Sequence, residues 1–152
     1  FTDGTKATGA IQKRKYDVPG EYSEILKITD SNGHTAYDFA VVQVRLSEDL
    51  GRTIPVMQAA YYPTLNLKAG EPVTFLVRTF NTAVDNELWD FGDGSPKVTT
   101  KCETVIRPHH IKTKFAETTH TFANTGQYIV RVERADENGY KAVTHLCVEV
   151  MK

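Results

Sequence analysis

The sequence predicts an all-β fold made of short strands. Apolar and polar residues alternate along most of the chain, for example over residues 22–28 and 73–77, and a period of two is typical of strands that bury one face. Two Asn-Gly pairs, at residues 32–33 and 138–139, each separate two such runs, which indicates a hairpin at each place. No amphipathic pattern with the period of an α-helix interrupts this alternation.

The expected strands follow one another along the chain and are bounded by Gly, Asn, Asp and Pro turns. In chain order they cover residues 22–28, 37–46, 56–67, 73–77, 88–91, 128–132 and 143–150. Residues 47–55 are polar and contain Gly and Pro, so we expect a linker there. Residues 97–119 mix β-branched residues with a proline and adjacent histidines, and we expect an elaborated hairpin or a long loop.

The most specific motif is WDFGDG at residues 89–94, and it is followed by HTF at 120–122 and GQY at 126–128. Trp89 and Phe91 are two positions apart, so both side chains point to one face of a strand. The Gly-Asp-Gly that follows predicts a turn in which short carboxylates cap backbone amides. A buried aromatic pair that enters such a turn is typical of the core of a β-sandwich.

Comparison of the chain with itself indicates an internal repeat. PGEY at residues 19–22 falls on TGQY at 125–128, and Asp30, Asn32, Gly33 and Ala36 each recur 106 positions later. In the same way, FTDGT at the start of the chain falls on FGDGS, 90 positions later. We therefore predict two homologous modules in tandem.

The repeat divides the chain into a truncated first module and a complete second module. We assign residues 1–46 to the C-terminal part of the first module, 47–55 to a linker and 56–152 to the second, with an insert at about 97–119. The strands expected over residues 72–79 and 86–89 have no counterpart upstream. Because half a sandwich would expose an apolar face and open strand edges, we expect a fragment of a longer polypeptide, bound to the remainder of its parent or to a complementary fragment.

These motifs resemble the PKD (polycystic kidney disease) repeat, an immunoglobulin-like domain with the pattern WDFGDG, H-x-Y or H-x-F, G-x-Y and a closing D-x-x-G. The residues that match this signature are Trp89, Asp90, Phe91, Asp93, His120, Tyr128 and Asp136. The resemblance implies tandem immunoglobulin-like β-sandwiches in which His120 is structural and the Tyr128 hydroxyl bonds nearby backbone as a tyrosine corner. It also implies an accessory or spacer module, as in large secreted and surface proteins, often bacterial hydrolases.

Charge and composition exclude several classes of partner. The chain has 18 Lys or Arg and 19 Asp or Glu, for a net charge of −1, so no basic field is available to bind nucleic acid or an anionic membrane. No run approaches the roughly 20 apolar residues of a membrane span. The two cysteines, Cys102 and Cys147, leave two alternatives open, a disulfide between the insert and the last strand or two free thiols.

Glu24 is the first candidate ligand contact, because it occupies a core position in an otherwise alternating apolar strand. A carboxylate without partners is costly to bury. One alternative is that the Glu24 carboxylate is hydrogen-bonded within the chain or exposed at a strand edge. The other is that it faces a ligand together with His34, Tyr37 or Asp38. Arg134 is the matching departure in the second module, near a strand end where its head group can reach water.

Three tyrosines are candidates for contact with carbohydrate, since an exposed aromatic ring offers an apolar face to a sugar. Tyr61 and Tyr62 are adjacent in a strand, so they present at most one ring to each face, and Tyr140 follows an Asn-Gly turn. The alternative is that these rings pack inward or decorate the surface.

The sequence predicts no cofactor and no metal site. His109 and His110 have the residue type of zinc ligands, but adjacent residues of a strand point to opposite sides. Asp90, Asp93 and Asp136 are hard oxygen ligands in turns, and some PKD domains bind calcium, so a calcium site is the alternative to turn-capping carboxylates.

We expect a non-catalytic accessory or spacer module of a larger secreted or cell-surface protein, located outside the cell or in the periplasm. The expected parent is a polysaccharide-active enzyme, and the module itself makes weak contact with carbohydrate or protein. No nucleophile motif, phosphate-binding loop or dinucleotide fingerprint supports catalysis. The alternative function is a ligand-binding or hydrolytic fragment, with Glu24 contributing to a site that upstream residues complete.

Overall fold

The structure is a computed structural model that describes residues 1–45, 53–103 and 115–152. These residues form nine strands and no helix, which confirms the all-β fold. The strands are β1 (Gly20–Thr29), β2 (Thr35–Val44), β3 (Val56–Tyr62), β4 (Pro72–Phe80), β5 (Glu87–Asp90), β6 (Val98–Thr100), β7 (Ala116–Thr121), β8 (Gly126–Ala135) and β9 (Lys141–Val150). Most of the expected linker, together with His109 and His110, lies outside the described residues. A helix able to cross a membrane is likewise not found in the described ranges.

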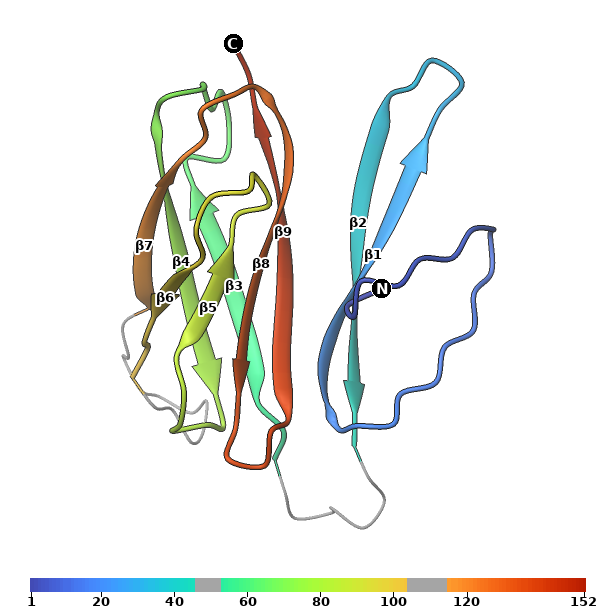
Figure 1. Cartoon of the computed structure of the whole chain (residues 1–152), viewed down its shortest axis with the longest axis vertical. Coiled ribbons are helices and arrows are strands. Elements are labelled where there is room, and N and C mark those ends of the chain that lie inside the picture. Colours follow the sequence, from blue (N-terminus) through green and yellow to red (C-terminus); the bar gives the residue numbers. More distant parts are fainter. Residues whose placement is uncertain (46–52, 104–114) are drawn as a thin grey trace.

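The strands form two sheets (Figure 1). β3, β4 and β7 form a three-stranded sheet, and the six-stranded sheet has the order β2-β1-β9-β8-β5-β6. The smaller sheet packs on the β9-β8-β5 part of the larger one, which makes a β-sandwich. The β1–β2 hairpin continues the larger sheet beyond β9 and stands to one side of the sandwich.

The core of the sandwich lies between β4 on one side and β5, β8 and β9 on the other. Alternation along each strand turns apolar side chains inward and polar ones outward. The ring of Phe75 stands at the centre, with its centroid 5.7 Å from Trp89 and 5.1 Å from Phe91. The apolar residues that this alternation turns inward are all buried, namely Val73, Phe75, Val77, Trp89, Phe91, Val130, Val132, Val148 and Val150.

Two elements differ from those predicted. The strand expected over residues 56–67 ends at Tyr62, before Pro63, because proline has no N–H to continue a strand ladder. The insert contributes β6, which pairs with β5, and the start of β7, which pairs with β4. Since β5 and β4 belong to different sheets, β6 and β7 do not form the single hairpin that was one of the two expected forms.

The β1–β2 and β8–β9 hairpins have the same construction. Each has ten residue pairs in unbroken antiparallel register. At their turns, Asp30 and Asp136 each accept hydrogen bonds from the backbone N–H groups two and four residues later. The hydroxyls of Tyr22 and Tyr128 each donate to the carbonyl oxygen four residues earlier, at 2.7 and 2.9 Å. Tyr128 therefore has the bond of a tyrosine corner, and Tyr22 repeats it.

The first hairpin joins the sandwich through a short parallel pairing. Gly20 and Glu21 of β1 pair with Lys141 and Ala142 of β9, and beyond this point the two strands diverge (Figure 1). Only a glycine fits at position 20, because a Cβ there would lie 2.6 Å from the Lys141 carbonyl oxygen. Gly126, at the same position of the second hairpin, has the same φ of 157°, but the nearest atom to a Cβ there is 3.7 Å away.

Candidate functional site

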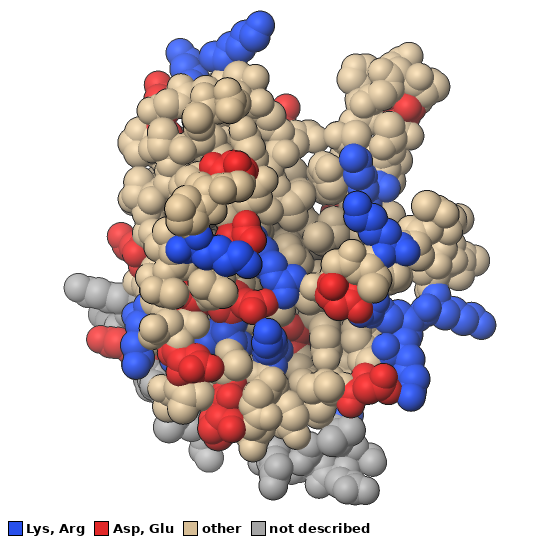
Figure 2. Space-filling model, in the orientation of Figure 1, with Lys and Arg blue, Asp and Glu red and all other residues tan. Residues whose placement is uncertain are grey.

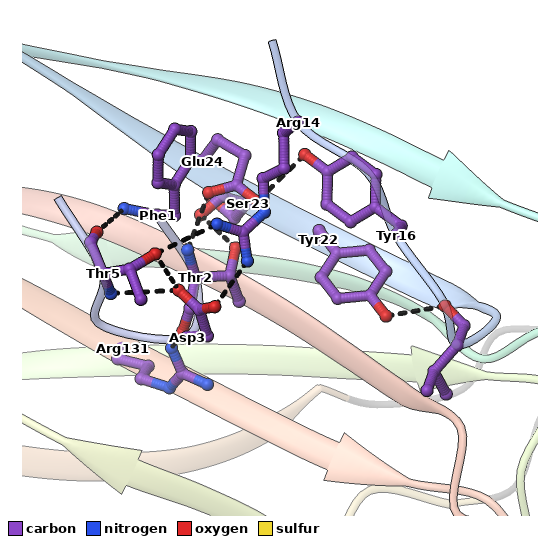
Figure 3. Close-up of polar contacts among 11 residues, drawn as sticks. Phe1, Thr2, Asp3, Thr5, Arg14, Tyr16, Tyr22, Ser23, Glu24 and Arg131 are labelled. Carbon is purple, nitrogen blue, oxygen red and sulfur yellow. Dashed lines mark hydrogen bonds and ion pairs between the residues drawn. The ribbon is translucent and has the colours of Figure 1, made fainter. Parts of the chain in front are cut away.

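Glu24 lies in a polar cluster between β1 and the N-terminal segment (Figure 3). Its Oε2 accepts a hydrogen bond from the Thr2 N–H at 2.6 Å, its Oε1 accepts one from the Tyr16 hydroxyl at 3.0 Å, and the Arg14 Nε lies 3.6 Å from Oε1. The carboxylate is therefore satisfied within the chain, which is the first of the two alternatives left open by the sequence. Contact between Glu24 and a ligand stays a prediction.

Arg14 connects this cluster to the turn at Asp3 (Figure 3). It donates to Asp3 Oδ2 at 2.7 Å and to Thr5 Oγ1 at 3.1 Å, and its guanidinium carbon lies 4.4 Å from the centroid of the Phe1 ring. Hydrogen bonds from Arg14 and Thr5 hold the pKa of Asp3 well below its usual range. The bond to Asp3 in turn raises the pKa of Arg14. Both groups are therefore charged at physiological pH.

The turn after the WDF motif has a matching arrangement. His120 Nε2 lies 2.7 Å from Asp93 Oδ2, and the His120 ring stacks on Phe91 with the centroids 3.9 Å apart. Arg14 has a similar arrangement near the N-terminus, since it too joins an aromatic ring to the aspartate of a turn. His120 therefore makes the packing and hydrogen-bonding contacts expected of a structural histidine.

The three signature aspartates cap turns. Asp90 and Asp93 each accept the backbone N–H two residues later at 3.0 Å, and Asp136 accepts those two and four residues later at 2.9 Å. Burial opposes the ionisation of Asp93, but hydrogen bonds from Ser95 and His120 outweigh it and lower the pKa of Asp93 to about 2. Within the described part of the chain, no group of three His, Cys, Asp or Glu side chains is placed to hold a metal.

The residues suggested as partners of Glu24 have other contacts. His34 bonds the aspartate of its own hairpin turn, with Nδ1 2.9 Å from the carboxylate. The Tyr37 ring lies under Lys27, whose Nζ is 5.6 Å from the ring centroid. Asp38 is exposed on β2 and accepts the next backbone N–H at 2.8 Å. Among the described residues, Glu24 forms no hydrogen bond or ion pair with any of the three.

The three candidate tyrosines differ in exposure. The Tyr61 hydroxyl donates to the Cys147 carbonyl oxygen at 2.9 Å, and its ring packs against the core near Phe75. Tyr62 points to the other face of β3 and is 52% exposed. Tyr140 is half-buried beside the β8–β9 turn. Tyr62 therefore offers the most open ring of the three, and carbohydrate contact stays a prediction.

A buried ion pair joins Glu87 of β5 to Arg134 of β8, and it was not predicted. Arg134 Nη1 is 2.7 Å from Glu87 Oε1, and both side chains are completely buried. Arg134 Nε donates to the Val84 carbonyl oxygen at 3.0 Å, and the Thr79 hydroxyl donates to Glu87 at 3.0 Å. The expectation that Arg134 reaches water is wrong, because Glu87 stands across from it on the inner face of the sheet and supplies a partner.

The two cysteines have different surroundings. The Cys102 N–H donates to Glu87 Oε2 at 3.1 Å, and the Cys102 sulfur lies 3.3 Å from Arg134 Nη1. Cys147 lies half-buried on β9, and both thiols are free. Burial raises the pKa of Cys102 and of Cys147, so both are kept in the unreactive thiol form.

A second buried carboxylate, that of Glu21, joins the first hairpin to the sandwich. Its Oε1 accepts the Met57 N–H at 2.9 Å, and its Oε2 accepts the Gln43 amide at 2.9 Å. Arg131 of β8 also donates to the Thr2 carbonyl oxygen, at 2.7 Å. Glu21 was not predicted as a contact because Met57 lies far from it in the sequence, beyond the linker.

The stability of the chain is expected to fall as the pH is lowered from about 6.5 to 4. The cause is His145 of β9, which is buried beside Phe39 at the junction between the β1–β2 hairpin and the sandwich. Burial, and then the charge of Arg131, lower the pKa of His145 from 6.5 to about 4. In this window the unfolded chain binds a proton that the folded chain does not, so stability is full above the window and is lost as the pH falls. The loss amounts to about 3 kcal/mol.

Urea unfolding at several pH values measures this loss. His145→Gln is expected to remove most of the pH dependence in this window, because glutamine does not titrate. An equal slope in the wild-type chain and in the variant would contradict the assignment to His145.

The sandwich is similar to known domains. Residues 58–148, more than half of the chain, match the family model described as the PKD domain. Among solved structures, the PKD domain of an M14-like peptidase from Thermoplasmatales archaeon SCGC AB-540-F20 is similar, with 25% sequence identity and a TM-score of 0.45. That similarity covers 64% of this chain and 94% of the other.

Proposed function

The chain belongs to the PKD domain family, and on that premise we propose that it is a non-catalytic accessory or spacer module of a larger protein. PKD domains are generally non-catalytic modules, and they occur mainly in extracellular or secreted proteins. In our proposal the parent is secreted, periplasmic or displayed at the cell surface, and it acts on a polysaccharide. Both signs of charge are interspersed on the face shown in Figure 2, which agrees with a surface that has no single-sign field.

The observation that carries the spacer function is the bonded junction between the first hairpin and the sandwich. A spacer has to hold the parts on either side of it at a fixed distance and angle. Glu21 is bonded to Met57 at the start of β3 and to Gln43 on β2, so one buried carboxylate holds three strands together. The Phe39 ring stacks beside His145 at 6.0 Å between centroids, which adds an apolar contact farther from the linker.

We also propose that the β1–β2 hairpin belongs to another, partial copy of the PKD module, the one that the sequence analysis calls the first module. The equal register of the two hairpins supports this duplication, as do the matching Tyr22 and Tyr128 bonds. Arg14 and His120 also occupy equivalent places beside an aspartate turn. Among the described residues, the first copy has counterparts of β8 and β9 only, and it lacks counterparts of β3 to β7.

Weak contact with carbohydrate or protein is a further part of the proposal. Tyr62 supports it, since its ring is open to solvent on an outer strand. A single ring without a deep pocket supplies little free energy after the cost of ordering the ligand. This contact is therefore secondary to the spacer function.

Glu21→Ala is expected to loosen the junction without unfolding the sandwich. The change leaves the buried Met57 N–H without its acceptor, which costs about 1–3 kcal/mol at the junction. Residual dipolar couplings of the isotope-labelled chain measure whether residues 1–45 and the sandwich keep a fixed relative orientation. In the wild-type chain, residues 1–45 and the sandwich should fit one alignment tensor, and in the variant they should require two.

Glu149→Ala is the matched control, because Glu149 is an exposed glutamate on β9. It should leave the single tensor unchanged. A wild-type chain that already needs two unrelated tensors would overturn the rigid spacer.

A further inference from the structure

His145 lies on the outer face of β9, away from the core of the sandwich. Its neighbour Leu146 packs against that core, so the side chain of His145 points to the opposite face of the sheet. The outer face of an antiparallel sheet is commonly in contact with water. His145 is nevertheless only 7% exposed. Something other than the core therefore buries it.

The β1–β2 hairpin supplies this cover. The Phe39 ring of β2 stacks on the His145 ring, with the centroids 6.0 Å apart and the planes 21° from parallel. Ser23 of β1 is buried, and its carbonyl group lies close enough to act on the pKa of His145. If the hairpin moved away from β9, the His145 ring would return to solvent while the core between the two sheets stayed in place.

The docked position of the hairpin suits only the neutral form of His145. Its Nδ1 atom is buried and has no hydrogen-bond partner among the described residues. A neutral imidazole tolerates this, because one of its two ring nitrogens carries no proton. The imidazolium has an N–H on both nitrogens, so protonation at Nδ1 would bury a donor without an acceptor. Proton uptake and docking of the hairpin therefore oppose each other.

The charged groups around His145 act in both directions. Arg131 of β8 and the ammonium group of Phe1 disfavour the imidazolium. Glu24 and the Ser23 carbonyl, both of β1, favour it, and β2 faces the ring with an aromatic side chain that does not titrate. Burial has the largest effect, and with Arg131 it lowers the pKa of His145 from 6.5 to about 4. Since the hairpin causes the burial, the low pKa belongs to the docked state.

We propose that His145 makes the junction between the β1–β2 hairpin and the sandwich a pH-sensitive joint, docked at neutral pH and opened by acid while the sandwich stays folded. Opening exposes His145 as global unfolding does, but it leaves the core intact. The contacts that it breaks are the short pairing of β1 with β9, the Glu21 bond to Met57 and the stacking of Phe39 on His145. The inference rests on the spacer function proposed above and names the condition under which the spacer loses its fixed angle.

The size of the effect follows from proton linkage. Opening returns the pKa of His145 from about 4 to its ordinary value of 6.5. Because the open state then binds a proton that the docked state does not, the ratio of open to docked chains should rise about 20-fold between pH 7 and pH 5.

Hydrogen exchange of the full, isotope-labelled chain, followed by NMR, tests the joint. The Met57 N–H is the reporter, since its acceptor is the Glu21 carboxylate across the junction. Its protection factor, which corrects for the intrinsic effect of pH on exchange, is expected to fall about 20-fold from pH 7 to pH 5. The N–H of Val132, in the core strand β8, should keep its protection over the same range.

His145→Gln should abolish the fall in Met57 protection, because glutamine does not titrate. His34→Gln is the matched control, since His34 is an exposed histidine of the same hairpin that bonds the aspartate of its turn, and it should behave like the wild-type chain. An NMR titration of the His145 ring in the wild-type chain adds a readout that needs no variant. It should give a pKa of about 4.

Three results would each overturn the joint. Met57 protection could fall equally in the wild-type chain and in His145→Gln, in which case another titrating group causes it. Val132 could lose protection together with Met57, which would show that acid unfolds the sandwich. His145 could titrate near 6.5 in the wild-type chain. The alignment measurement at pH 7 tests the rigid spacer by itself, so a single tensor at pH 7 with pH-independent Met57 protection would overturn the joint alone.

Discussion

Trp89→Ala is expected to lower the free energy of unfolding by about 3–5 kcal/mol. The Trp89 side chain is fully buried, and its ring lies 6.2 Å from that of Phe91 and 5.7 Å from that of Phe75, measured between centroids. Its Nε1 also donates to the Thr100 hydroxyl at 3.0 Å, so the truncation removes the tie between β5 and β6. The loss is comparable to the total stability of many small domains.

Urea unfolding followed by circular dichroism measures this loss. Tyr62→Ala is the control, because Tyr62 is an exposed aromatic residue, and it should change stability by less than about 0.5 kcal/mol. A Trp89→Ala variant with the midpoint of the parent would show that this ring does not hold the two sheets together.

Arg134→Met is expected to cost about 3–5 kcal/mol, because it leaves the Glu87 carboxylate buried without its cation. Burial alone would raise the pKa of Glu87, but its contacts with Cys102 and Arg134 outweigh this effect and lower that pKa. Without Arg134, no positive charge of this residue offsets the cost of burying the ionised Glu87 carboxylate. Denaturant unfolding of the variant at pH 7 gives the size of the loss.

The double variant Glu87→Leu with Arg134→Met separates the charge from the packing. Because both buried charges are gone, it should recover most of the stability lost in the single variant. If the double variant is as unstable as Arg134→Met alone, the loss comes from the packing of the arginine stem and not from the unpaired carboxylate.

The core and the turns of the sandwich were predictable because they depend on local patterns. Strand parity alone places Trp89 and Phe91 on one face, and the Asn-Gly pair lies in the turn between β8 and β9, as expected for a hairpin. Arg134 was not predictable in the same way. Its burial depends on Glu87, which lies on another strand and becomes its neighbour only through the register of β5 on β8.

The candidate site was predictable only in part. The departure of Glu24 from the apolar alternation marks it as unusual, and the structure satisfies it with Thr2, Tyr16 and Arg14. Those partners come from an irregular segment, and no periodic pattern in the sequence indicates where such a segment lies. The role of Glu21 was not predictable either, because its partner Met57 lies beyond the linker and no sequence pattern connects the two residues.

Gly20 and Gly126 have equivalent places and the same φ, yet mutation should affect them unequally. A side chain at position 20 meets the Lys141 carbonyl oxygen of β9, whereas a side chain at position 126 meets nothing closer than 3.7 Å. The cost of a side chain at position 20 therefore includes a clash between the hairpin and β9, which has no equivalent at position 126. A residue other than glycine at position 20 would therefore have to push β1 away from the Lys141 carbonyl oxygen, so this one position limits how closely the hairpin can approach β9.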